Sequence, residues 1–286
     1  MDIAKFRIEP DSNFKLSDIK PEDTGKFESK EEAGRLLAEN IEKMADLQDI
    51  LYAQDKYAML IIFQAMDTAG KDGAIKHVMA GLNPQSTHVH SFKQPSAEEL
   101  DHDYLWRAIK NFPERGQIGI FNRSYYEEVL VVKVHDLVKN QQLPKEFITD
   151  DIWKNRYRQI RDFEKYMFEN GIVVIKFFLH ISKDEQKKRL LDRIDDKSKN
   201  WKFSAADIKE RQFWDSYQHC YEEAIRETST KHAPWYIIPS NKKWYSRLII
   251  SEAIVQTMEK LKLEYPKISE EQKQLLQECK EKLENE

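Results

Sequence analysis

Short hydrophobic segments alternate with longer amphipathic segments along the chain, and this alternation predicts the secondary structure. Residues 57–63 (YAMLIIF) and 172–179 (IVVIKFFL) are almost entirely apolar, as expected for strands buried on both faces of a parallel sheet. Residues 87–92, 117–121 and 235–239 are shorter segments that predict three further strands. The sequence therefore predicts five strands, some of them buried on both faces.

The segments between these strands have the pattern of helices. Residues 29–32 form a capping box, S-x-x-E, and a helical pattern follows it to about residue 56. Further helices are predicted from Ser96 to about residue 111, over residues 151–170, from Ser182 to about residue 196, and over residues 204–228, 241–263 and 269–286. Strands that alternate with helices predict an α/β fold, with helices on both faces of a parallel sheet.

No internal repeat or long linker divides the chain, so one domain is expected. Residues 1–28 are polar, contain prolines and show no clear period, which predicts an extended arm draped over the domain. Residues 29–268 form the predicted domain, and residues 269–286 form a charged helical tail. In a parallel sheet, ligands bind beyond the carboxyl ends of the strands, so the segments after the first, third and fourth strands are expected to carry the chemistry.

The composition excludes several classes of protein. Of the 286 residues, 40% are hydrophobic, which excludes wholesale disorder, and the formal net charge of −4 argues against a nucleic-acid partner. Cys220 and Cys279 are far apart, which disfavours a disulfide framework or a structural zinc site. Because no signal peptide is present and no apolar stretch approaches the ~20 residues that span a bilayer, we expect a cytoplasmic protein without a membrane partner.

The segment after the first strand, residues 65–73 (AMDTAGKDG), resembles the P-loop pattern G-x-x-x-x-G-K-[ST]. A tight loop that opens a helix directs backbone N–H groups at a phosphate; Gly70 permits close approach and Lys71 adds positive charge. Ala65 replaces the first glycine of the pattern, and Asp72 with Gly73 replaces the Ser or Thr that holds magnesium. Asp67 and Asp72 therefore suggest a phosphate site bridged by a metal, although Asp72 is also suited to cap the helix.

The segment after the third strand offers further groups for a phosphate and a metal. Asn122 stands where P-loop proteins carry a metal-binding acid, and its carbonyl oxygen is able to coordinate a cation. Arg123 is suited to grip a phosphate with two parallel hydrogen bonds. Glu127 and Glu128 are candidates for metal or substrate contact. The alternative for both is that they only stabilise the first turn of a helix, where the helix dipole favours a negative charge.

The segment after the fourth strand is locally basic. Residues 183–211 contain ten Lys or Arg and seven Asp or Glu, so the net charge of this segment is positive, whereas that of the whole chain is negative. Arg189 and Arg193 are four residues apart and share a helix face; Lys202 lies in a polar stretch and Arg211 in the next helix. Two helices joined by a basic loop over the strand ends predict a lid that closes on phosphates. The alternative is an ordinary solvated helical hairpin.

At these segments the chain resembles the polyphosphate kinase 2 family. The resemblance covers roughly residues 30–265 and rests on an ordered set of motifs: FQAMDTAGKDG at 63–73, SFKQP at 91–95, HDYLWR at 102–107, FNRSYYE at 121–127, WKFS at 201–204, and APW at 233–235 with Ile238 and Pro239. It implies a thymidylate-kinase-like P-loop fold and phosphoryl transfer between inorganic polyphosphate and a nucleotide. Asn122, with residues 64–67 and 126–127, resembles the branch that phosphorylates both nucleoside mono- and diphosphates.

The resemblance also implies the roles of particular residues. Asp67, Lys71, Arg123 and Arg193 are the expected catalytic residues. The expected polyphosphate site comprises Ala69, Gly70, Lys71, Asp72, Gly73, Lys76, Lys93, Arg123, Arg189, Lys202 and Arg211. Expected nucleotide contacts are Asp67, Asn122, Arg123, Glu127 and Arg193. Magnesium, or manganese in its place, is the expected cofactor; Asp67 is its first candidate ligand, with Asn122 and Asp72 as further candidates.

The chemistry of these residues fits that reaction. A nucleotide phosphate is largely ionised at pH 7, since its second pKa is ~6, so no strong general base is required. The difficulty is to bring two polyanions together, and a metal with several cations screens their repulsion. The expected partners are inorganic polyphosphate, adenine nucleotides and, as a further candidate, guanine nucleotides, in a homo-oligomer. The alternatives are an ATP-dependent nucleoside or nucleotide kinase of the same fold, a non-enzymatic polyphosphate sensor and, more remotely, a nucleic-acid-binding protein.

Overall fold

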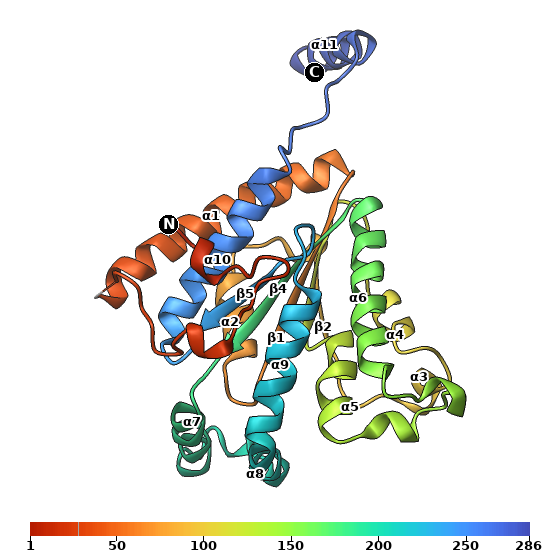
Figure 1. The fold of residues 1–286 in the computed structure, drawn as a ribbon. Helices are drawn as coiled ribbons and strands as arrows, with labels where there is room; N and C mark the ends of the chain where they lie inside the picture. Colours follow the sequence, from red (N-terminus) through yellow and green to blue (C-terminus); the bar gives the residue numbers. More distant parts are fainter. Residues whose placement is uncertain (28) are drawn as a thin grey trace.

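The computed structural model describes residues 1–27 and 29–286, and five parallel strands form its central sheet (Figure 1). The strands lie in the order β2-β3-β1-β4-β5. Their bounds are Ala58–Ala65 for β1, Thr87–Ser91 for β2, Ile118–Asn122 for β3, Ile172–His180 for β4 and Trp235–Pro239 for β5. The prediction of an α/β fold with five parallel strands is confirmed, and the long apolar strands β1 and β4 lie side by side in the middle of the sheet.

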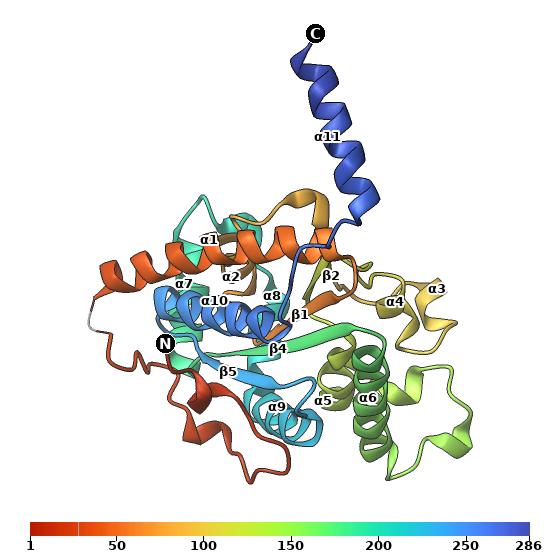
Figure 2. The ribbon, with the colours of Figure 1, turned by 90° about the horizontal axis from the view of Figure 1, so that it is seen from above.

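Helices cover both faces of the sheet, as Figure 2 shows. On one face lie α1 (Lys30–Gln54), α2 (Lys71–Val78) and α10 (Lys243–Lys260). The other face carries α6 (Ile152–Glu169) and α9 (Trp214–Thr228). The remaining helices are α3 (Ala97–Leu100), α4 (Trp106–Ile109), α5 (Val131–Val134), α7 (Lys183–Asp195), α8 (Ala205–Glu210) and α11 (Glu270–Glu284).

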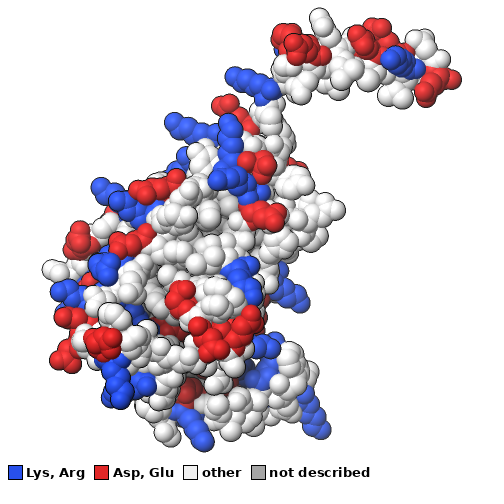
Figure 3. All heavy atoms as spheres, turned by 90° about the vertical axis from the view of Figure 1, so that its right-hand side faces the viewer, with Lys and Arg blue, Asp and Glu red and all other residues white. Residues whose placement is uncertain are grey.

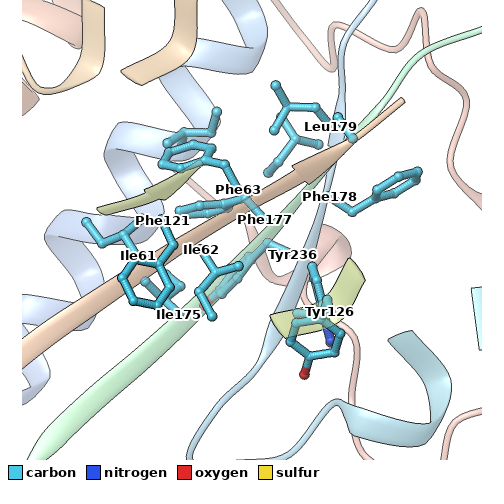
Figure 4. Close-up of a cluster of buried hydrophobic side chains, with 14 of the residues drawn as sticks. Ile61, Ile62, Phe63, Phe121, Tyr126, Ile175, Phe177, Phe178, Leu179 and Tyr236 are labelled. Atoms are coloured by element: carbon cyan, nitrogen blue, oxygen red, sulfur yellow. The ribbon is translucent and has the colours of Figure 1, made fainter. Parts of the chain in front are cut away.

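The core lies between the sheet and these helices. All eight residues of β1 are buried, and in β4 only the first residue is partly exposed, which explains their continuous apolar sequence. Figure 4 shows part of this core, where the ring centroids of Phe63 and Phe177 on adjacent strands are 5.3 Å apart. This buried framework holds the carboxyl ends of the strands, and the loops that follow them, in fixed positions.

Two helices predicted as continuous are interrupted in the structure. The segment that begins at Ser96 has the expected capping box, yet it ends after one turn and α4 starts only at Trp106. Between them, the Asp103 side chain accepts a hydrogen bond from the Leu105 N–H at 2.9 Å, a local contact that competes with helix formation. The segment 204–228 is divided into α8 and α9 by a short 3₁₀ turn over Arg211–Phe213.

Serine caps begin three other helices where the sequence places them. The hydroxyl oxygens of Ser29, Ser182 and Ser269 each accept a hydrogen bond from the N–H three residues later, at 3.1 or 3.2 Å. Each bond satisfies one of the N–H groups that a helix leaves unpaired at its start. The prediction of a helix start at each of these positions is confirmed.

The two terminal segments differ in their contact with the domain. Phe6, Ile8, Phe14 and Leu16 of the first segment are buried, and the Ile8 N–H donates to the Trp235 carbonyl of β5. The last residue of the predicted arm, Glu28, lies outside the described residues. No residue of α11 is buried, and Figure 3 shows this helix standing clear of the body with acidic and basic side chains along it. Within residues 1–27 and 29–286, no helix is long and apolar enough to cross a membrane.

Candidate active site

The phosphate loop connects the buried end of β1 to the first turn of α2. Gly70 adopts φ +112°, a conformation that favours glycine, and its carbonyl accepts the Ala74 N–H at the start of α2. The Lys71 side chain is 9% exposed, and its ammonium group donates to the Ala65 carbonyl at 2.9 Å. Burial lowers the pKa of Lys71 to about 8, and the nearby Arg123 guanidinium acts in the same direction. The lysine is therefore held close to the backbone that would cradle a phosphate.

Arg123 joins this loop to the segment after β3. Its backbone has φ +64°, and its N–H donates to the Phe63 carbonyl of β1. Its guanidinium donates to Asp67 Oδ1 at 2.9 Å and to Glu127 Oε2 at 3.1 Å. The Glu127 carboxylate, followed by the Asp67 carboxylate, raises the pKa of Arg123. The Arg123 guanidinium thus keeps its positive charge and lies between two carboxylates, one of which belongs to the phosphate loop.

Asp67 and Asp72 supply the carboxylate oxygens of the loop, which are the groups suited to bind a metal ion. Asp72 Oδ1 accepts a hydrogen bond at 2.8 Å from the side-chain amide of Asn122, so the end of β3 and the start of α2 meet there. No group of three or more His, Cys, Asp or Glu within residues 1–27 and 29–286 is arranged to hold a metal. Magnesium in phosphotransferases is held by one or two carboxylates together with substrate phosphates, so a pair of carboxylates fits this cation.

These side chains line a cavity of about 480 Å³ beyond the carboxyl ends of β1, β3 and β4. Its wall contains eleven of the residues predicted from the sequence: Asp67, Ala69, Gly70, Lys71, Asp72, Gly73, Asn122, Arg123, Arg189, Arg193 and Lys202. Along the sequence, these eleven residues lie on three separate segments. The fold brings them together around a single cavity that is rich in cations.

Four predicted residues lie elsewhere. Lys93 and Glu127 line a second cavity next to the first. Lys76 is exposed on α2 and lines neither cavity. Arg211 also lines neither; its guanidinium donates to the Lys183 carbonyl and to the Gln186 side chain, at 2.8 and 2.7 Å.

Sequence reasoning missed a group of cavity residues after the fifth strand. Lys243, Ser246 and Arg247 on α10 also line the cavity. Burial lowers the pKa of both Lys243 and Arg247, and the described residues provide neither with an ion pair or a hydrogen bond. The rule that ligands bind at strand ends applies equally to β5, so the basic residues that follow this strand are the sequence signal for this group.

The second cavity has a volume of about 680 Å³ and a mainly apolar wall. Phe92 and Arg123 line both cavities, so the two spaces lie next to each other on either side of these residues. Tyr104, Leu100, Val131 and Leu137 contribute apolar surface, while Gln141 and Asn140 add amide groups. A pocket of this size, apolar with a few polar groups, is typical of a site for a small organic ligand.

Comparison with known proteins agrees with this geometry. Residues 26–266 match the family model described as Polyphosphate kinase 2. The "ADP-polyphosphate phosphotransferase" of Rhodopseudomonas palustris is 53% identical over 88% of this chain and 88% of its own length. The "AMP/ADP-polyphosphate phosphotransferase" of Meiothermus ruber is 46% identical over 92% of this chain and 96% of its own length.

A solved structure gives the same result for the fold. The crystal structure of polyphosphate kinase 2 from Arthrobacter aurescens superposes with a TM-score of 0.86 at 39% identity, over 96% of this chain and 95% of that one. The parallel sheet flanked by helices is therefore a P-loop kinase-like fold. The family match spans the phosphate loop, the segment after β3 and the segment after β4, and the chain belongs to the polyphosphate kinase 2 family.

Proposed function

We propose that this protein transfers the terminal phosphoryl group of inorganic polyphosphate to AMP and to ADP. The observation that carries the proposal is the pair of adjacent cavities: one is lined by phosphate-loop groups and cations, the other is largely apolar, and Arg123 lines both. Relatives whose names refer to ADP and to AMP/ADP support both acceptors. The alternative is an ATP-dependent nucleoside or nucleotide kinase of the same fold. Asp72 at the position of the usual Ser or Thr weighs against that alternative, and the family match favours polyphosphate as the donor.

The basic cavity is suited to the donor chain. Lys71 and Arg123 lie where the transferred phosphoryl group would sit, and Arg193 and Lys202 approach from the lid segment. Lys243 and Arg247 on α10 add two further cations to the wall of this cavity, and neither has an acidic partner among the described residues. Cations without partners suit a ligand that carries one or more negative charges at each phosphate.

The apolar cavity is suited to the nucleoside of the acceptor. A nucleotide bound there would direct its phosphate towards Arg123 and Asp67. One of its ionised oxygens then attacks the terminal phosphorus of polyphosphate. The new bond joins that oxygen to the phosphorus, and the bond to the bridging oxygen breaks, so that the shortened polyphosphate leaves with the electron pair.

Magnesium is the proposed cofactor, with Asp67 and Asp72 as the protein groups that would hold it. A divalent cation on the phosphate oxygens supplies positive charge that neutralises the charge developing during transfer. Asn122 donates its amide hydrogen to Asp72 Oδ1, and this hydrogen bond restrains the Asp72 carboxylate. The segment 183–211 is the proposed lid, whose cations reach the substrate when it closes.

The experiment uses the purified protein with magnesium, long-chain polyphosphate and either AMP or ADP, followed by chromatography of the nucleotides. We expect AMP to yield ADP and then ATP without another enzyme, and GMP and GDP test the breadth of acceptors. Asp67→Asn should abolish transfer, whereas Asp49→Asn, an exposed acid on α1, should leave it unchanged. Transfer from ATP but not from polyphosphate would overturn the proposal.

A further inference from the structure

Arg189 lines the phosphate cavity, but its guanidinium is fully engaged within the protein. Its Nε donates to Glu185 Oε1 at 2.8 Å, Nη1 to the carbonyls of Thr68 and Ala69, and Nη2 to the carbonyls of Ser240 and Asn241. An arginine has five N–H donors, so each of them has an acceptor here. The residue is 6% exposed, which leaves it little surface for a ligand.

A second residue of α7 continues this contact. The Gln186 side-chain amide, which is 1% exposed, donates to the Asp67 carbonyl at 3.2 Å. Its own carbonyl oxygen accepts a hydrogen bond from the Arg211 guanidinium at 2.7 Å. Three consecutive carbonyls of the phosphate loop, at positions 67, 68 and 69, are therefore held by two side chains of one helix.

These bonds determine which way the loop faces. In a planar trans peptide the carbonyl and the N–H point in opposite directions, so an Ala69 carbonyl held by α7 turns the Gly70 N–H away from that helix. Thr68 has φ +64°, a conformation that residues with a side chain adopt only when surrounding contacts maintain it. The contacts that hold its carbonyl are those of Arg189.

We propose that Glu185, Gln186 and Arg189 form a positioning clamp, latched by Arg211, that holds the phosphate loop in its phosphate-binding shape. Arg189 then acts through the loop and does not bind polyphosphate itself. The inference deepens the proposed function, on which its kinetic part rests. It also limits the mobile part of the lid: the start of α7 stays with the loop, and closure involves residues beyond Arg189.

Arg193, one turn further along α7, provides the contrast. Its guanidinium uses Nη1 alone, donating to Asp207 Oδ2 at 3.1 Å and to the Lys202 carbonyl at 3.3 Å. Both partners belong to the lid segment itself, and within residues 1–27 and 29–286 no hydrogen bond or ion pair joins the Arg193 guanidinium to the phosphate loop. Donors therefore remain for a phosphate, and Arg193 is the matched control for a direct ligand.

Gln186→Met gives the sharpest kinetic test, because the side chain is neutral and its loss removes no attraction for polyphosphate. We expect kcat to fall on the order of 10- to 100-fold, the range that misplacement of a site by about 1 Å produces, while KM for polyphosphate stays within about twofold. Glu185→Ala should lower kcat in the same way, and Glu185→Gln, which keeps an acceptor for Nε, should restore most of it. Arg193→Lys should instead raise KM for polyphosphate.

Amide hydrogen exchange in the protein without substrate tests the clamp independently of the reaction. Peptides that cover residues 64–72 should exchange faster in Gln186→Met and Arg189→Lys than in the original protein, and at an unchanged rate in Arg193→Lys. If Arg189→Lys raises KM for polyphosphate and leaves this exchange unchanged, Arg189 is a phosphate ligand and the proposal is overturned. Failure of the original protein to use polyphosphate would instead overturn the proposed function and leave the exchange result to judge the clamp.

Discussion

At the scale of single residues, the charge of Lys71 links the site to pH. Burial lowers the pKa of its ammonium group to about 8, and only the protonated form attracts phosphate. Because the cation is lost as the pH rises through that value, kcat/KM for polyphosphate should fall by about tenfold per pH unit above it. A bound polyanion favours the charged lysine, so the decline in kcat should begin at a higher pH. Initial rates between pH 6.5 and 10 measure both profiles.

The matched variant for this prediction is Lys71→Arg. A guanidinium keeps its charge throughout that pH range, so the residual activity of the variant should show no alkaline decline. A decline at the same pH in both proteins would assign the titration to a group other than Lys71.

The residue scale also shows where sequence reasoning ends. That Asp67, Lys71 and Arg123 line one cavity was predictable, because each belongs to a motif at the end of a predicted strand. Arg189 and Arg193 were not distinguishable, since a spacing of four residues places both on one helix face. Only the positions of the loop carbonyls, set by the packing of α7 against distant segments, give the two arginines different surroundings.

At the scale of elements, a buried ion pair anchors the segment after β3 to the sheet. Lys176 of β4 donates to Glu164 of α6 at 2.5 Å, and both side chains are fully buried. The hydroxyls of Tyr125 and Tyr126, two and three residues after Arg123, donate to the same Glu164 carboxylate. Burial lowers the pKa of Lys176 and raises that of Glu164, while each charge opposes the shift of the other. Lys176, the one lysine in β4, therefore has a structural role.

Replacement of one member of this pair should be costly. Lys176→Met leaves a buried carboxylate without its cation, and we expect the free energy of unfolding to fall by about 3–5 kcal/mol. The double variant Glu164→Gln with Lys176→Met removes both charges and keeps an oxygen acceptor for the tyrosines, so it should lose less than the single variant. Urea unfolding followed by tryptophan fluorescence measures both values. A loss in the double variant as large as that in Lys176→Met, or larger, would contradict this expectation.

Element boundaries were predictable where a local signal determines them. The serine caps fix the starts of α1, α7 and α11 through hydrogen bonds between near neighbours. The break after α3 depends on Asp103, whose bond to a nearby N–H competes with a helix that the sequence pattern also permits. That competition is decided by tertiary packing, which a single sequence does not display.

At the scale of the whole molecule, alternation of strands and helices predicted a parallel sheet but contained no signal for the order β2-β3-β1-β4-β5. The order matters for the site, because it brings the segments after β1 and β3 side by side and also places β5 next to β4. The basic residues after β5 consequently reach the cavity. Charge counted along the chain did not reveal this contribution, since it depends on which strands are neighbours.

The two ends of the chain should contribute unequally to stability. Phe6 is 1% exposed and packs edge-on against Tyr245, so Phe6→Ala should lower the free energy of unfolding by about 3–4 kcal/mol. Removal of residues 269–286 takes away a helix without a buried residue and should change that value by less than about 0.5 kcal/mol. Urea unfolding at two protein concentrations measures both effects. A loss of stability in the shortened chain that grows with protein concentration would contradict this expectation, because only association between copies has that dependence, and α11 would then be assigned to a contact between subunits.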